Sequence, residues 1–206
     1  MPASGERRIL AQLRRYGLLL KQDKVLPSVV GLITGEALAA SWWSHPRAKE
    51  IFDLLQALSE RSDILETKLI DGKVTFVYEP LWPAWLGVAT CVEDWQTAGL
   101  SVAAKKLLTE VKRAREREAS GPAVKELELR LCVHTEQRHS ESGKHVLVLE
   151  NWANWAKRRA VRALPVPESK RILERAAQAL GAPLSALPWH DKRRVRAQVR
   201  ARAKQR

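Results

Sequence analysis

Cysteine, clustered glycine and long apolar runs are all scarce in this sequence of 206 residues. The two cysteines, Cys91 and Cys132, lack metal-ligand spacing, so we expect reduced, unpaired thiols and no structural metal site. No apolar run approaches the ~20 residues of a membrane-spanning helix, and residues 1–8 lack the apolar core of a signal peptide. These absences predict a cytoplasmic protein without membrane partners.

Glycine-rich loops are also missing. The ten glycines stand singly, so the sequence offers no loop of backbone N–H groups that cradles phosphates. No Ser-His-Asp or Cys-His set can be assigned to a fold either. We therefore expect no cofactor, no nucleotide-driven chemistry and no nucleophilic hydrolysis.

Acidic residues are rare only in the C-terminal part of the chain. Residues 151–206 hold 15 Lys and Arg against 3 acids, a balance of +12, whereas residues 1–150 hold 21 against 20, a balance of +1. A near-neutral body with a basic end predicts a polyanionic partner held by that end, and nucleic acid is the favoured polyanion. A membrane surface is less favoured, because residues 191–206 contain no aromatic side chain for an interface.

Residues 46–79 contain the clearest pattern that is present. Apolar residues at helical spacing follow Pro46 and predict a helix; they are Ile51, Phe52, Leu54, Leu55 and Leu58. Two strand-like segments then flank Asp71-Gly72, a pair that closes two-residue type I′ hairpins. With that turn, Thr67 should face Phe76. A helix followed by a hairpin is the second half of a winged helix.

A similar order returns further along the chain. An apolar-periodic helix is predicted over residues 100–114, and a second, longer hairpin has arms at residues 129–139 and 144–150. We predict an α+β fold of two tandem winged-helix-like units with a basic helical C-terminal arm, divided as residues 1–90, 91–156 and 157–206. The alternative is another small α+β domain of helices and hairpins.

Shorter patterns complete the expected fold. Helices are predicted over residues 4–20, over residues 28–33 with Gly35 as the stop, and over residues 168–180. Residues 81–86 read as an apolar connector between the two units, because their prolines do not fit a central strand.

Trp42 and Trp43 are adjacent, so they cannot both face the same side of a helix. One is expected to be buried and the other exposed or at an interface. A stacking platform for a base is the functional interpretation, and a core tryptophan beside a helix start is the favoured structural one.

Three features in order resemble a known family. They are the aromatic pair with His45-Pro46, the helical residues 47–58, and Gly72-Lys73-Val74 followed by residues 77–82. Over about 45 residues they are similar to the winged-helix segment of the AlkZ/YcaQ-type bacterial DNA glycosylases, which excise alkylated and crosslinked bases. The catalytic Gln-x-Gln or Gln-x-Asp motif of that family does not occur here, and the nearest string is Gln137-Arg138-His139. The resemblance therefore implies tandem winged helices that handle DNA.

The second predicted hairpin gathers the residues that are capable of chemistry. On a strand, Cys132, His134, Glu136 and Arg138 would share one face, and the turn would bring His145 beside Arg138. Such a face suits acid–base catalysis, with His134 and Glu136 as candidates, or a metal site, or contact with nucleic acid. A plain solvated hairpin is the remaining alternative.

Together these patterns predict a repair-associated protein that binds double-stranded DNA in the nucleoid and is not an enzyme. Helix residues Arg47, Lys49, Lys125 and Arg130 are the groove-facing candidates, and Lys73, Arg138, Lys144 and His145 belong to the wings. The basic end adds Lys192, Arg193, Arg194, Arg196, Arg200, Arg202, Lys204 and Arg206. A small glycosylase and an RNA-binding protein are the alternatives.

The basic C-terminal residues should make the affinity for duplex DNA depend more steeply on salt concentration. Each neutralised phosphate contributes ~0.9 to the slope of log affinity against log salt. A chain that ends near Pro188 should stay folded and lose several units of that slope in titrations with duplex DNA. Equal slopes for the full and the shortened chain would show that the basic end is not the anchor.

Overall fold

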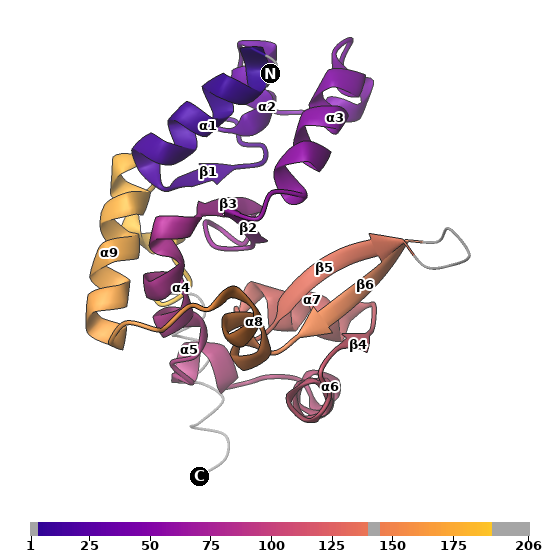
Figure 1. Ribbon diagram of the computed structural model, residues 1–206, viewed down its shortest axis with the longest axis vertical. Helices are drawn as coiled ribbons and strands as arrows, with labels where there is room; N and C mark the ends of the chain where they lie inside the picture. The colour runs from indigo at the N-terminus through magenta and orange to yellow at the C-terminus, as the bar shows by residue number, and fades with distance from the viewer. Residues whose placement is uncertain (1–3, 140–144, 191–206) are drawn as a thin grey trace.

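The computed structural model describes residues 4–139 and 145–190, and they form an α+β fold with two small antiparallel sheets of three strands each (Figure 1). The predicted α+β class is confirmed. Predictions for Lys144 and for the basic residues from Lys192 onward lie outside the described residues, and only the backbone of His145 is described. No helix among the described residues is long and apolar enough to cross a membrane.

The first sheet belongs to the N-terminal half. The elements in chain order are α1 (Ser4–Tyr16), β1 (Leu18–Leu20), α2 (Val29–Thr34), a 3-10 turn (Trp42–Ser44), α3 (Ala48–Ser59), β2 (Ile64–Thr67) and β3 (Thr75–Tyr78). The strand order is β1-β3-β2, so the last strand is central. α2 lies one residue later than predicted at each end, because Ser28 is its N-cap and not its first helical residue, and Gly35 ends it as predicted with φ +84°.

The prediction of one helix over residues 4–20 is wrong at its end. α1 stops at Tyr16, Gly17 has φ +73°, and β1 follows at once. All three leucines of β1 are buried and pair with β3. A run of consecutive apolar residues suits a buried strand as well as a helix, so periodicity did not separate the two.

The Asp71-Gly72 turn forms as predicted, but the strand register differs by one residue. Both turn residues have positive φ, at 51° and 67°, and the Lys73 N–H donates to the Ile70 carbonyl at 2.9 Å. Thr67 nevertheless pairs with Thr75 and not with Phe76. The extra residue on the β2 side lets Leu69 and Ile70 both be buried, although consecutive strand residues face opposite sides.

The second sheet repeats this strand order. Its elements are α6 (Val102–Arg113), β4 (Arg117–Glu118), α7 (Pro122–Leu129), β5 (His134–His139) and β6 (His145–Glu150), with the order β4-β6-β5. β5 starts later than predicted, since Leu129 ends α7. In the β5–β6 pair, His145 lies opposite His139, and Arg138 lies opposite Val146. The prediction that His145 lies beside Arg138 is therefore also wrong by one residue.

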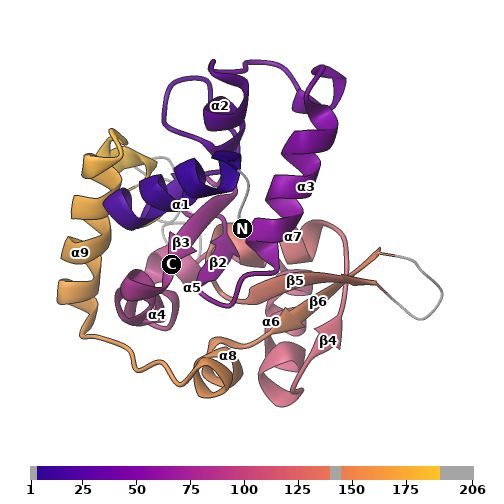
Figure 2. The same cartoon turned by 45° about the horizontal axis from the view of Figure 1, so that its top comes forward.

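The remaining helices are packed elements. They are the 3-10 turn Glu79–Leu81, α4 (Trp82–Ala89), α5 (Asp94–Thr97), α8 (Trp152–Arg159), α9 (Val166–Ala179) and the 3-10 turn Leu184–Ala186. The predicted apolar connector is therefore mostly the buried helix α4, with Pro83 in its first turn. α9 lies along α4, with Leu173 and Ala177 fully buried, so this part of the predicted arm belongs to the main body (Figures 1 and 2).

Two hydrophobic cores result. The larger one joins the N-terminal half to α4, α8 and α9, and the smaller one lies under the second sheet, with Ala104, Val111, Leu127 and Leu149 at its centre. Near the end of the described chain, Trp189 donates to Glu174 at 2.9 Å and His190 contacts the same carboxylate at 2.7 Å. A shortened chain should therefore end after His190 to leave these contacts intact.

The close approach of α4 and α9 depends on Gly87. A Cβ at this position would collide with the Ser169 hydroxyl and with the Leu164 carbonyl oxygen. Gly87→Ala should lower the free energy of unfolding by about 1–3 kcal/mol, although alanine is the better helix former. Urea denaturation measures the change.

Ser169→Ala is the matched second change, because it removes the hydroxyl and leaves the Leu164 carbonyl in place. The double variant should recover only part of the loss. An increase in stability for Gly87→Ala alone would contradict the close contact.

Candidate nucleic-acid interface

An open groove of about 700 Å³ lies between the C-terminal end of α6, the segment before β4 and the outer side of α8. Its lining comes from two stretches that are far apart in the sequence, residues 112–116 and residues 150–158. The lining residues are Lys112, Arg113, Ala114, Arg115, Glu116, Glu150, Asn151, Asn154, Lys157 and Arg158.

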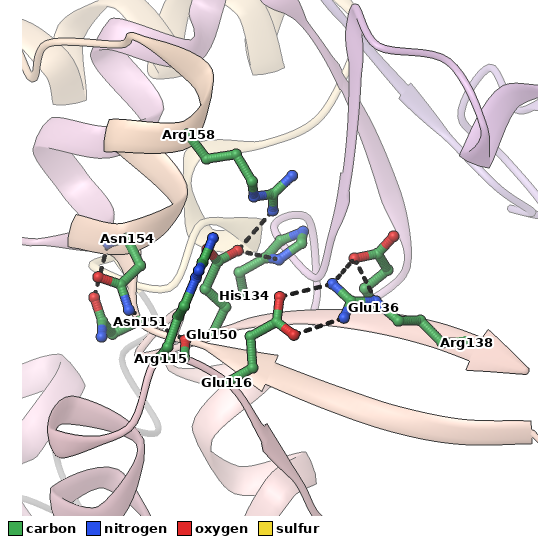
Figure 3. Close-up of polar contacts among 9 residues, drawn as sticks. All are labelled: Arg115, Glu116, His134, Glu136, Arg138, Glu150, Asn151, Asn154 and Arg158. Atoms are coloured by element: carbon green, nitrogen blue, oxygen red, sulfur yellow. Dashed lines mark hydrogen bonds and ion pairs between the residues drawn. The ribbon is translucent and has the colours of Figure 1, made fainter. Parts of the chain in front are cut away.

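Two asparagines fix the walls of the groove (Figure 3). The Asn151 side chain caps α8 by accepting from the Asn154 N–H at 2.9 Å, and its own amide donates to the Val111 carbonyl at 3.3 Å. The Asn154 amide donates to the Arg115 carbonyl at 3.1 Å. Both amides are therefore used to tie the end of α6 to α8, which sets the width of the groove.

Positive charge dominates the lining. Lys112, Arg113, Arg115 and Lys157 are exposed, and none of them forms an ion pair with another residue in the described part of the chain. The two carboxylates of the lining are both engaged: Glu116 pairs with Arg138 at 2.7 Å and Glu150 pairs with Arg158 at 2.6 Å. The groove therefore presents uncompensated cations, which suits a polyanion.

Glu150 is the buried charge at this site. Its side chain is 6% exposed, and one oxygen, Oε2, lies 2.6 Å from Nη2 of Arg158 and 3.6 Å from Nδ1 of His134. Burial acts to raise the pKa of this carboxyl group, but the contacts with His134 and Arg158 outweigh it and hold the pKa below its ordinary value. Glu150 is therefore a compensated carboxylate, and a low pKa makes it a poor general base.

The cations predicted in the first unit have intramolecular partners. Arg47 pairs with Glu50 at 2.8 Å, and Lys49 pairs with Asp53 at 2.8 Å. Lys73 pairs at 2.5 Å with Asp23, whose side chain is 3% exposed. Each of the three cations is therefore paired with a carboxylate of this chain.

Of the cations predicted in the second unit, Arg130 and Arg138 also have partners within the chain. Arg130 is a structural residue, because it donates to the carbonyls of Trp95 and Ala98 at 3.2 and 2.8 Å. Arg138 holds Glu116 through two hydrogen bonds and also contacts Glu136 at 2.8 Å, as Figure 3 shows. Lys125 alone stays exposed on α7 without an ion-pair partner among the described residues.

The proposed catalytic pair is not formed. His134 turns toward Glu150 and lies edge-on to Trp152 at 5.7 Å, whereas Glu136 contacts Arg138. Cys132 precedes β5, and burial raises the pKa of its thiol to about 11, so the thiol is unreactive at neutral pH. No group of three metal-ligating side chains occurs within residues 4–139 and 145–190.

The tryptophan pair behaves as expected. Trp42 is 7% exposed, Trp43 is 64% exposed, and the two rings stack at 4.0 Å. The prediction of one buried and one exposed ring is confirmed, while a role in base stacking stays a prediction.

Sequence reasoning missed the groove. Lys112, Arg113 and Arg115 form one basic run and Lys157 to Arg159 another, so each run was visible in the sequence. Their meeting depends on the packing of α6 against β6 and α8, which neither run reveals.

Comparisons with protein families, with curated proteins and with solved structures find no match to this chain.

The lowered pKa of Glu150 makes stability depend on pH. A glutamate titrates near ~4.3 in an unfolded chain, and Glu150 titrates lower in the folded chain, so its ionisation stabilises the fold above that range and this contribution is lost as the pH falls through the folded pKa. Glu150→Gln should therefore cost about 1–2 kcal/mol of unfolding free energy at neutral pH and much less in acid.

Urea denaturation of both proteins at several pH values measures this difference. Glu116→Gln is the matched control, because its carboxylate also pairs with an arginine but is far more exposed and should show a smaller effect. An equal difference at neutral and acidic pH would contradict the assignment to ionised Glu150.

Proposed function

We propose that this protein binds duplex DNA and that the sugar–phosphate backbone lies in the groove between α6 and α8. The observation that carries the proposal is the set of four exposed cations around one groove, Lys112, Arg113, Arg115 and Lys157, with no carboxylate partner among the described residues. Phosphate contacts of this kind supply affinity without reading the sequence.

The order of elements supports DNA as the polyanion. Each half runs through a helix, a strand, further helix and two hairpin strands, with the last strand in the centre of the sheet. That order is the one expected for a winged helix, and we propose two such units in tandem. Fold analogy alone does not assign function, so the groove carries the proposal and the topology adds to it.

The lining favours a duplex over a single strand. Proteins that bind single strands place aromatic rings along the groove so that bases can stack. No aromatic residue lines this groove, and the exposed Trp43 lies beside α3 in the other half. A groove of cations and amides suits a backbone whose bases are turned inward.

We propose binding without catalysis, in a repair-associated role. Glu150 is the buried carboxylate of the groove, and its compensation by Arg158 and His134 leaves no general base with a raised pKa there.

The test is a titration of a short blunt duplex with single alanine variants. Lys112→Ala, Arg115→Ala and Lys157→Ala should each weaken binding several-fold for every duplex sequence, and each should lower the slope of log affinity against log salt by ~0.9. Such uniform losses follow because phosphate contacts carry no base information.

Lys24→Ala and Arg171→Ala are the matched controls. Both residues are exposed cations, and neither lines the groove. In Figures 1 and 2, α9, which carries Arg171, lies on the other side of α8 from α6. If the controls lose as much affinity as the groove variants, binding is a property of net charge and the groove is not the site.

A further inference from the structure

The carboxylate of Glu150 is unexpected in a groove that is proposed to bind a polyanion, because it would repel phosphate. Glu150 ends β6, directly after the buried residues Val148 and Leu149. An apolar side chain would fill the same buried position without a desolvation cost and without repelling phosphate. The carboxylate is therefore expected to contribute something that packing does not supply.

Glu150 holds one cation of the groove in place. Arg158 lies on the last turn of α8 and donates through Nη2 to Glu150 at 2.6 Å. His134 approaches the same oxygen at 3.6 Å, and its ring packs edge-on against Trp152. The carboxylate is thereby held by a histidine whose ring packs against Trp152 of the larger core.

Arg158 keeps most of its hydrogen-bonding capacity. A guanidinium has five N–H donors in a planar fork. One is used on Glu150, the side chain is 38% exposed, and it makes no other hydrogen bond with the described residues. Figure 3 shows one terminal nitrogen directed at Glu150 and the other turned away from it.

We propose that Glu150, supported by His134, is a positioning residue that presents the free edge of the Arg158 guanidinium to a backbone phosphate in the groove. The inference rests on the proposed binding of duplex DNA at this groove. A fixed guanidinium binds phosphate through two parallel N–H bonds, and it loses less side-chain freedom on binding than an unrestrained one.

The positioning role and simple charge repulsion predict opposite effects of Glu150→Gln on the affinity for duplex DNA. If Glu150 acts only as a negative charge, Glu150→Gln removes repulsion and tightens binding of duplex DNA. If Glu150 positions Arg158, the same variant weakens binding, because the Arg158 side chain must then be ordered by the DNA itself.

The experiment compares the full-length protein with Glu150→Gln, Arg158→Ala and the double variant in titrations of a short blunt duplex at several salt concentrations. Glu150→Gln and Arg158→Ala should each weaken binding roughly tenfold, the size expected for hydrogen bonds to a charged group. The Arg158→Ala slope should fall by ~0.9. In the Arg158→Ala background, Glu150→Gln should cause no further loss.

Two further variants separate positioning from charge and from folding. Glu50→Gln removes a carboxylate that also pairs with an arginine, Arg47, and neither residue lines the groove, so binding should be unchanged. Arg158→Lys keeps the charge at a part-exposed position and should still weaken binding, because an ammonium group lacks the fork. Thermal melts confirm that each variant is folded at the assay temperature.

The outcomes are distinct. Unchanged or tighter binding by Glu150→Gln overturns the positioning role, and so does an equal loss in the presence and absence of Arg158. Either result leaves duplex binding by the groove standing, since the wild-type protein still binds. A wild-type protein that does not bind duplex DNA overturns both proposals.

Discussion

The contact between four tryptophans of α4 and α8 is the constraint on which the rest of the structure depends. Trp82 packs edge-on against Trp155 at 5.2 Å, and Trp85 packs in the same way against Trp152 at 5.6 Å. Trp152 also donates to the Leu131 carbonyl at 2.8 Å, which brings the end of α7 into the larger core. Aromatic rings of this size bury large apolar areas and prefer edge-to-face geometry, so the cluster fixes the two halves of the chain against each other.

The same tryptophan cluster sets the position of one wall of the groove, because α8 carries residues of both the cluster and the groove. Trp152 and Trp155 form the buried side of α8, and Asn154, Lys157 and Arg158 form the side that lines the groove. His134 connects the two sides, since its ring contacts Trp152 while its Nδ1 faces the buried Glu150. The cations of the groove are therefore held on a helix whose orientation is set by the core, and a rigid support of this kind favours precise phosphate contacts.

The parts of the fold that local rules decide could be predicted from the sequence. The stop of α2 at Gly35 and the positive φ at Asp71-Gly72 depend on neighbouring residues alone, whereas the adjacency of Trp42 and Trp43 predicts that one ring is buried and does not say which. The missed features depend on tertiary contacts: β1 is a strand because β3 is available to pair with it, and the hairpin register shifts because the core accepts both Leu69 and Ile70. The groove was missed for the same reason, since its two basic runs meet only through the packing of α6 and α8.

By itself, a basic side chain indicates a binding site for an anion only if no acidic side chain of the same chain already pairs with it. Arg47 and Lys49 have acids three and four residues later on the same helix, and such pairs neutralise each other on the helix surface, so the sequence alone argued against them as phosphate contacts. Lys157 has no acid at that spacing on α8, and its basic neighbours lie in the last turn, where they also favour the helix dipole. Spacing alone does not decide the other cations of the groove, since Glu116 stands four residues after Lys112 but pairs with Arg138. The tertiary structure shows which carboxylates are already engaged, and so which cations are left for an interface.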